Sequence, residues 1–173
     1  QYWIRDIKWS PDGNLLALAS EWSIQIWNID KTEEPVKISE WPTQLFENVK
    51  ELTSMTRNNP HKGFKVSLAW SPDGKIIASG GDDCLIRIWE LANRRLVGIL
   101  EGHTNSVNCL SFSVDGTLLA SKSKDNTFRL WQCDEWNMIS VVDESTNDLS
   151  SAGIEFHPEH QKLASLGEGG TVV

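Results

Sequence analysis

The sequence has little of what marks disulfide-rich, membrane or nucleic-acid-binding proteins. Its three cysteines form no Cys-x-x-Cys pair, which argues against a disulfide framework or a thiolate zinc site. No apolar run approaches the ~18–20 residues of a membrane-spanning helix, and no basic-then-apolar signal opens the chain. Only 16 Lys and Arg face 24 Asp and Glu, for a net charge of −8. We therefore expect a reducing, cytoplasmic setting, with neither a membrane nor a nucleic acid as partner.

The negative charge is concentrated toward one end of the sequence. Residues 134–173 hold eight acids and a single base, Lys162, whereas residues 1–133 are nearly neutral. Two interpretations stay open: a solvated rim of the fold, or an edge that docks a basic partner.

Tryptophan is abundant, with nine residues, whereas tyrosine occurs once. Hydrophobic residues make up 39% of the chain and charged residues 23%, which is typical of a chain that folds around a core. So many tryptophans require a recurring structural use, and this makes internal repeats the first pattern to test.

Four segments share a run of apolar residues, an aromatic residue and a turn. The aromatic residues are Trp9, Trp70, Phe112 and Phe156, separated by 61, 42 and 44 residues. The turn reads Ser-Pro-Asp-Gly in the first two segments, Ser-Val-Asp-Gly in the third and His-Pro-Glu-His in the fourth. The chain therefore repeats with a period of 42–44 residues, interrupted by one insertion after the first repeat.

Each repeat predicts short strands. After the turn come an apolar stretch, a polar turn and an alternating run, which closes on Trp27, Trp89 or Trp131 in the first three repeats. Strict alternation rich in Ile and Val favours strands over helices. A further strand is expected over 36–39, 96–100 and 138–142. Every complete repeat is then four strands, a to d, joined by turns.

A four-stranded repeat of this length resembles a blade of the WD-repeat (Trp-Asp repeat) β-propeller family. The third repeat carries the likeness best, with Gly102-His103, the turn over 113–116, Asp125 and Trp131. No closing Trp is followed by Asp, which departs from the family pattern. The resemblance implies an all-β fold, built as a propeller arc of four-stranded antiparallel blades.

We expect one partial propeller domain over residues 1–173. Its repeats are expected at about 4–39, 64–101, 103–142 and 147–173, the last truncated, with an insertion at 40–60. Apolar residues at helical spacing after Thr43 predict a short helix over about 43–53, either packed on the rim or docking a partner. Since an open arc leaves strand edges unpaired, we expect the remaining blades from the same longer chain or from another subunit.

Residues that look like a Ser-His-Asp catalytic set recur at fixed positions of the repeats. They are His103, Ser121 or Ser123, Asp125 and Trp131 in the third repeat, and His61, Ser79, Asp83 and Trp89 in the second. In the resembled family these positions form a structural relay: Trp donates to the hydroxyl, the hydroxyl meets His, and His meets Asp. No oxyanion-hole segment or nucleophile elbow accompanies them. We therefore expect a structural role, no enzyme activity and no cofactor.

Two further motifs suggest ligands only at first sight. His157 and His160 have the spacing of a His-x-x-His metal site, but a turn containing Pro does not present two imidazoles on one helix face. The stretch 80–83 lacks the spacing of a phosphate loop and the alternating oxygen ligands of a calcium loop. We expect no metal.

The tryptophans divide into two groups. Five fall in register and are expected in the core between blades rather than on a base-stacking platform: Trp9, Trp27, Trp70, Trp89 and Trp131. Four lie outside those positions and are candidates for exposed anchors: Trp3, Trp22, Trp41 and Trp136.

These observations favour a noncatalytic protein–protein interaction scaffold, whose stiff blades present loops to a protein partner. By resemblance, the b–c turns and d–a connections carry the contacts. The expected contact residues are Glu21, Trp22, Trp41, Phe46, Lys62, Asp82, Asn105 and Lys124. The alternative is a sensor or regulatory propeller of a larger multidomain signalling or nucleotide-hydrolysing protein.

Overall fold

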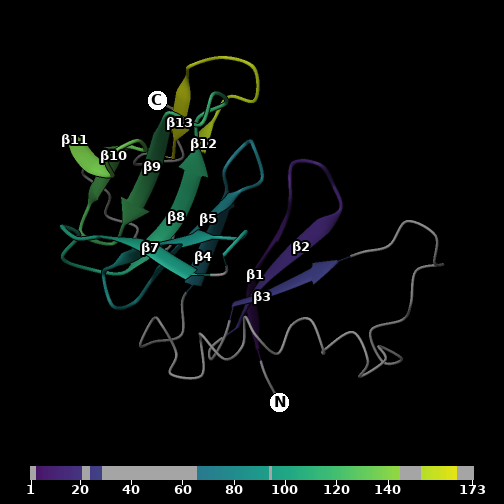
Figure 1. Cartoon of the computed structure of the whole chain (residues 1–173). Helices are drawn as coiled ribbons and strands as arrows, with labels where there is room; N and C mark the ends of the chain where they lie inside the picture. The colour runs from purple at the N-terminus through teal and green to yellow at the C-terminus, as the bar shows by residue number, and fades with distance from the viewer. Residues whose placement is uncertain (1–2, 21–23, 29–65, 94, 145–152, 167–173) are drawn as a thin grey trace.

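The computed structural model describes residues 3–20, 24–28, 66–93, 95–144 and 153–166, and in these residues every regular element is a strand (Figure 1). The first sheet contains β1 (Ile4–Trp9), β2 (Leu15–Ser20) and β3 (Ile24–Asn28). The second contains β4 (Val66–Trp70), β5 (Ile76–Gly81), β6 (Ile86–Glu90) and β7 (Arg95–Leu100). The third contains β8 (Val107–Phe112), β9 (Leu118–Ser123), β10 (Thr127–Gln132) and β11 (Asn137–Asp143), and the fourth β12 (Ile154–Phe156) and β13 (Leu163–Ser165).

The strands of each sheet follow one another in chain order, and all pairs are antiparallel. The predicted all-β fold of four-stranded antiparallel blades is therefore confirmed, since the second and third sheets each have four strands in this order. The strand expected over 36–39, the insertion at 40–60 and the helix expected over about 43–53 lie outside the described residues.

In the first three sheets, the turn between the first two strands is fixed by its serine and aspartate. In the second sheet the Ser71 hydroxyl donates to Asp73 Oδ1 over 2.6 Å and accepts from the Ile76 backbone N–H over 2.9 Å. Gly74 has a φ of 70°, a value that an L side chain disfavours. The same bonds recur at Ser10 and Ser113, so the repeated turn letters encode one local structure.

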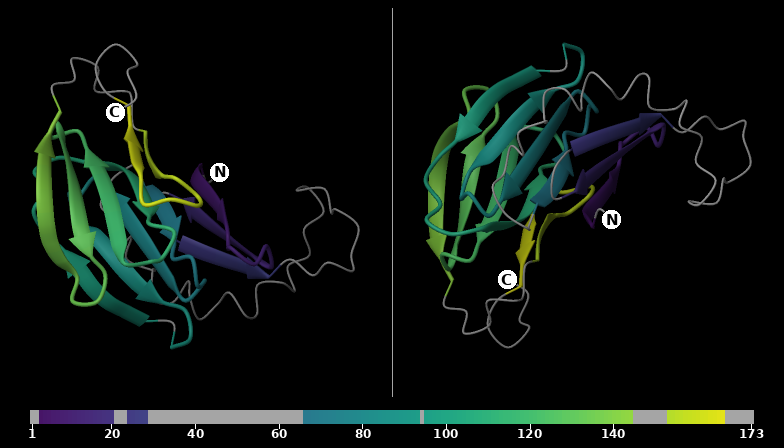
Figure 2. Two further views of the ribbon diagram at one scale, coloured as in Figure 1. Left: turned by 90° about the horizontal axis from the view of Figure 1, so that it is seen from above. Right: turned by 90° about the horizontal axis from the view of Figure 1, so that it is seen from below.

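Consecutive sheets pack face to face, and their first strands run next to one another, β1 against β4, β4 against β8 and β8 against β12 (Figure 2). One core lies between the first two sheets, around Ala17, Ile24 and Leu68. Another lies between the second and third, around Ile88 and Leu119. Because each apolar face is buried by its neighbour, each sheet depends on the next for its core.

Two of the tryptophan predictions are wrong. Trp9 was expected in a core between blades, yet 56% of it is exposed. Each aromatic of this register packs on the sheet that comes before its own, as when Trp70 Nε1 donates to the Lys8 carbonyl over 3.1 Å. Among the described residues no sheet precedes β1. Trp136, expected as an exposed anchor, is instead half-buried against the core of the second and third sheets.

Candidate functional site

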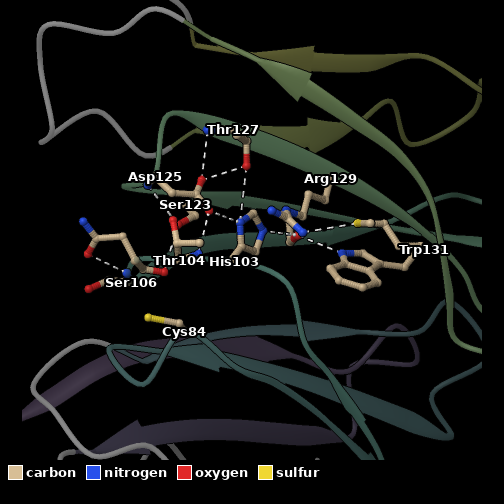
Figure 3. A network of polar contacts seen from close by, with 12 residues as sticks. Cys84, His103, Thr104, Ser106, Ser123, Asp125, Thr127, Arg129 and Trp131 are labelled. Carbon is tan, nitrogen blue, oxygen red and sulfur yellow. Dashed lines mark hydrogen bonds and ion pairs between the residues drawn. The ribbon is translucent and has the colours of Figure 1, made fainter.

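Four elements of the third repeat bring the predicted relay together. His103 lies between β7 and β8, Ser121 in β9, Asp125 in the turn after β9, and Trp131 in β10. Ser121 and Trp131 share one face of neighbouring strands because the residues of β9 and β10 pair in register, Ser121 with Arg129 and Leu119 with Trp131. Figure 3 shows His103 between the turn that carries Asp125 and the indole of Trp131.

The hydrogen bonds form one continuous chain. Trp131 Nε1 donates to the Ser121 hydroxyl over 2.8 Å. The Ser121 hydroxyl lies 2.8 Å from His103 Nε2, and His103 Nδ1 lies 2.8 Å from Asp125 Oδ2. With Asp125 ionised, Nδ1–H donates to the carboxylate, so Nε2 accepts the Ser121 O–H. Each donor in the chain then has one acceptor, which requires a neutral His103.

Burial and neighbouring groups set the protonation of this chain. Burial lowers the pKa of the His103 imidazole below its ordinary value of 6.5; Asp125 opposes that shift and the Arg129 guanidinium adds to it. Burial also raises the pKa of Asp125, but hydrogen bonds from Thr104, Thr127 and His103 outweigh it and lower the pKa to about 2. The geometry therefore holds a neutral imidazole beside an ionised carboxylate.

Two partners of the Asp125 carboxylate, Thr104 and Thr127, were not predicted from the sequence. Its Oδ1 accepts from the Thr127 backbone N–H over 3.0 Å and from the Thr127 hydroxyl over 2.7 Å, while Oδ2 accepts from the Thr104 N–H over 3.0 Å. The signal for Thr127 was present, because an Asp followed two residues later by Thr is a common side-chain-to-backbone turn. Thr104 contributes only its backbone N–H, a contact that the type of residue at this position does not predict.

Of the two serines expected as alternatives for the relay hydroxyl, only one occupies that position. Ser121 takes the position between Trp131 and His103. Ser123 instead donates to the Asn105 carbonyl over 2.9 Å and accepts from the Asp125 N–H over 3.1 Å. Ser123 thus ties the turn after β9 to the connection before β8.

The second repeat retains part of the same arrangement. Trp89 Nε1 donates to the Ser79 hydroxyl over 2.8 Å, as in the third repeat. Asp83 differs from its counterpart Asp125, because its Oδ2 accepts from Arg87 Nη1 over 2.6 Å. His61, the residue expected between Ser79 and Asp83, lies outside the described residues.

Three of the predicted contact residues converge on Ser106, and these four residues are called the Ser106 patch below. The Ser106 hydroxyl donates to Asp82 Oδ1 over 2.7 Å. The Ser106 N–H donates to Asn105 Oδ1 over 2.8 Å, and the Lys124 N–H donates to the Ser106 carbonyl over 2.9 Å. The patch therefore joins the turn after β5, the connection before β8 and the turn after β9. Ser106 belongs to no motif and was not predicted from the sequence.

The other predicted contact residues lie outside the described residues. They are Glu21, Trp22, Trp41, Phe46 and Lys62.

The described residues offer few groups for ligand chemistry. They hold no group of three or more His, Cys, Asp or Glu side chains that would suit a metal ion. His157 and His160 stack on each other, with ring centroids 4.6 Å apart, and His157 Nδ1 accepts from the Glu159 N–H. In the described part of the chain, no helix is long and apolar enough to cross a membrane.

Two surface hollows of about 340 Å³ each contain a cysteine. Burial raises the pKa of Cys133 to about 12, aided by Asp134 and Asp115. Burial likewise raises the pKa of Cys109 in the second hollow. Both sulfurs are therefore thiols at neutral pH, the weakly nucleophilic form of cysteine.

Antiparallel sheets in chain order, each packed on the next, define a repeat propeller. The third sheet carries the complete buried Trp-Ser-His-Asp chain, and the second retains its Trp-Ser part. Residues 1–28, 52–90 and 94–132 match the WD40 family, described as "WD domain, G-beta repeat". The chain belongs to the WD40 repeat family.

Comparison with curated proteins gives relatives over part of the chain. The chain is 40% identical over 68 residues to the General transcriptional corepressor TUP1 of Saccharomyces cerevisiae, an alignment that covers 39% of this chain and 9% of that protein. It is 28% identical over 102 residues to the U3 snoRNP-associated protein-like YAO of Arabidopsis thaliana, covering 57% of this chain and 19% of that protein. Neither name supports the expected cytoplasmic setting.

Solved structures show the same fold. A structure of U3-55K and one of the RRP9 WD40 repeats each superpose with a TM-score of 0.71, at 22% and 21% identity. Each comparison covers 96% of this chain and 46% of the solved chain. This chain thus spans less than half the length of each of these relatives and solved chains.

Proposed function

We propose that this chain is part of a noncatalytic scaffold that binds a protein partner through the Ser106 patch and the neighbouring turns. The observation that carries this proposal is the convergence of Asp82, Asn105 and Lys124 on one buried serine. The turns of two sheets are thereby held together before a partner arrives, through the Ser106–Asp82 side-chain bond and the Lys124 backbone N–H. Preorganisation of this kind lowers the entropic cost of binding.

The chemistry of the patch favours a protein surface over a nucleic acid. Asp82 and Lys124 supply one charge of each sign and Asn105 supplies an amide, a mixture that suits polar side chains of a partner. A nucleic acid requires clustered cations, and the chain carries a net charge of −8. The names of the curated relatives, a corepressor and a snoRNP-associated protein, agree with a role in larger assemblies.

The buried relay supports a noncatalytic role. Ser121 is fully buried, and the His103 and Asp125 side chains are 0% and 5% exposed. A serine nucleophile has to reach the carbon it attacks, and no substrate reaches a hydroxyl enclosed in this way. We propose that these residues, with Ser79, Asp83 and Trp89 in the second repeat, hold the blades in register.

Charge reversal on the patch tests the proposed function. We would capture partners on the full-length protein and compare Lys124→Glu with Lys75→Glu. The Lys75 side chain is 76% exposed. It lies next to Gly74 on the turn between β4 and β5, away from the Ser106 patch. Lys124→Glu should lower the affinity for the partner by about tenfold or more, as expected for reversing a charge at an interface. Lys75→Glu should bind the partner as the unmodified protein does. Equal binding by both variants would refute the patch as the contact.

A further inference from the structure

A second candidate contact surface lies on the outer part of the third sheet, away from the Ser106 patch. Its centre is Arg129 in β10, and its walls are Met138 and Val141 in β11. These three residues, called the Arg129 site below, share one face of the sheet because Arg129 pairs with Val141 and Trp131 pairs with Met138. Met138 is 45% exposed and Val141 is 44% exposed.

Arg129 is held in place without a carboxylate among the described residues. Its Nε is buried and has no hydrogen-bond partner. Its Nη1 donates to the Met138 sulfur over 3.3 Å, a weak acceptor. Figure 3 shows the guanidinium between His103 and Trp131. Because Nε is enclosed, a ligand carboxylate would meet the terminal nitrogens of the half-buried Arg129, where the thioether of Met138 is a poorer acceptor than a carboxylate.

The second sheet shows how the same position looks when it is satisfied internally. Arg87 occupies in β6 the place of Arg129 in β10, and it makes a 2.6 Å ion pair with Asp83. The counterpart of Asp83 in the third sheet is Asp125, whose two oxygens are taken by His103, Thr104 and Thr127. The relay therefore removes from Arg129 the carboxylate that Arg87 retains.

The guanidinium lies against the backbone of Gly102. Gly102 lies beside it so closely that a Cβ on Gly102 would fall 2.2 Å from Arg129 Nη1. The glycine lets the guanidinium lie against the backbone, next to the edge of the Trp131 ring. A side chain at position 102 would therefore displace the guanidinium from this place.

From this geometry we infer that the Arg129 site binds a peptide segment of another protein that carries one Asp or Glu between aliphatic side chains. The carboxylate accepts from the guanidinium, and the aliphatic side chains cover Met138 and Val141. A single cation among exposed apolar groups matches one carboxylate better than it matches a polyanion. This inference does not rest on the Ser106 patch, which occupies other turns.

The methionine methyl groups provide a direct readout. The chain has two methionines, Met55 and Met138. We would label the full-length protein with ¹³C-methyl methionine, assign the Met138 signal with Met138→Leu, and titrate a blocked Ser-Val-Leu-Asp-Leu-Val-Ser peptide. The matched peptide has Asn in place of Asp. The Met138 signal should move with the Asp peptide, and the Asn peptide should bind at least ~10-fold more weakly.

Two variants locate the binding. Arg129→Gln should reduce affinity for the Asp peptide by ~10-fold or more, and Arg87→Gln should leave it unchanged. A Met138 signal that does not move with the Asp peptide would overturn the inference, and so would equal binding of the two peptides. Inorganic phosphate moving the signal as far as the peptide would assign the site to a free anion instead. The peptide comparison uses the unmodified protein, so it stands even where Arg129→Gln does not fold.

Discussion

At the scale of residues, the Ser121 hydroxyl connects the two buried rings of the relay. Ser121 accepts from Trp131 Nε1 and lies within 2.8 Å of His103 Nε2. All three groups are buried, so none recovers its hydrogen bond from water when the hydroxyl is removed. The relay therefore fixes three separate segments of the third sheet through one oxygen atom.

Ser121→Ala should lower the free energy of unfolding by about 2–4 kcal/mol, because it leaves the indole N–H and the imidazole nitrogen unpaired. Thr104→Ala is the control, since Thr104 contributes its backbone N–H and its side chain is exposed. Urea unfolding measures both variants. A Ser121→Ala cost under ~1 kcal/mol would contradict the buried chain of hydrogen bonds.

The protonation of His103 makes stability depend on pH. Burial lowers its pKa in the folded state below 6.5, so at mildly acidic pH the unfolded chain binds the proton more tightly. The free energy of unfolding should therefore fall as the pH drops below about 6.5. His103→Asn should flatten this slope, measured by urea unfolding at several pH values. A slope that persists in His103→Asn would show that another group causes it, which would contradict a neutral buried imidazole.

At the scale of elements, equivalent positions of β5 and β9 pack against the next sheet with side chains of very different size. Gly80 in β5 leaves space for Val107 of the next sheet, because a Cβ on Gly80 would lie 2.6 Å from Val107 Cγ1. The equivalent residue in β9 is Lys122, which is 4% exposed. Its Nζ donates to Ser165 Oγ over 2.9 Å and to the Leu166 carbonyl, both beyond the boundary with the fourth sheet.

Gly80→Ala should destabilise the protein by about 1–3 kcal/mol, because the added methyl overlaps Val107. Gly98→Ala is the matched change in β7, where the nearest atom to a new Cβ is 3.6 Å away. That variant should be neutral or more stable by up to about 1 kcal/mol. Thermal unfolding of the pair decides the point, and similar losses in both would disprove close packing at Gly80.

Lys122 and Glu144 form a buried ion pair, with 2.5 Å between Nζ and Oε2 and side chains 6% and 11% exposed. Lys122→Met should lower the free energy of unfolding by about 3–5 kcal/mol, because it leaves the buried Glu144 carboxylate without its cation. Adding Glu144→Gln should recover about half of that loss or more. A double-mutant cycle in urea measures the coupling, and strictly additive losses would argue against the pair.

The sequence predicted the repeating elements well, for a physical reason. The strand alternation and the Ser-x-Asp-Gly turn are local, so the letters near each strand determine them. The relay of Ser121 and Asp125 was predicted from the resemblance to the WD-repeat family, and the recurrence of the same residue types in the second repeat favoured its structural role. Thr104, Ser106 and the environment of Lys122 were missed, since each depends on contacts between segments far apart in the sequence.

At the scale of the whole molecule, each sheet completes the core of its neighbour. This dependence explains the mistake over Trp9, whose side chain packs only where another sheet precedes it. It also explains why the turns of adjacent sheets meet at the Ser106 patch, where Asp82 belongs to one sheet and Lys124 to the next. A partner that binds there would contact two neighbouring blades at once.

Lysine crosslinking of the assembled full-length protein tests that account most directly. Lys124 lies on the proposed contact surface, whereas Lys75 is exposed on a turn between the first two strands of its sheet. We predict that mass spectrometry finds crosslinks from Lys124 to a protein partner and few from Lys75. Crosslinks that join the partner to Lys75 while Lys124 stays unlinked would contradict binding through the Ser106 patch.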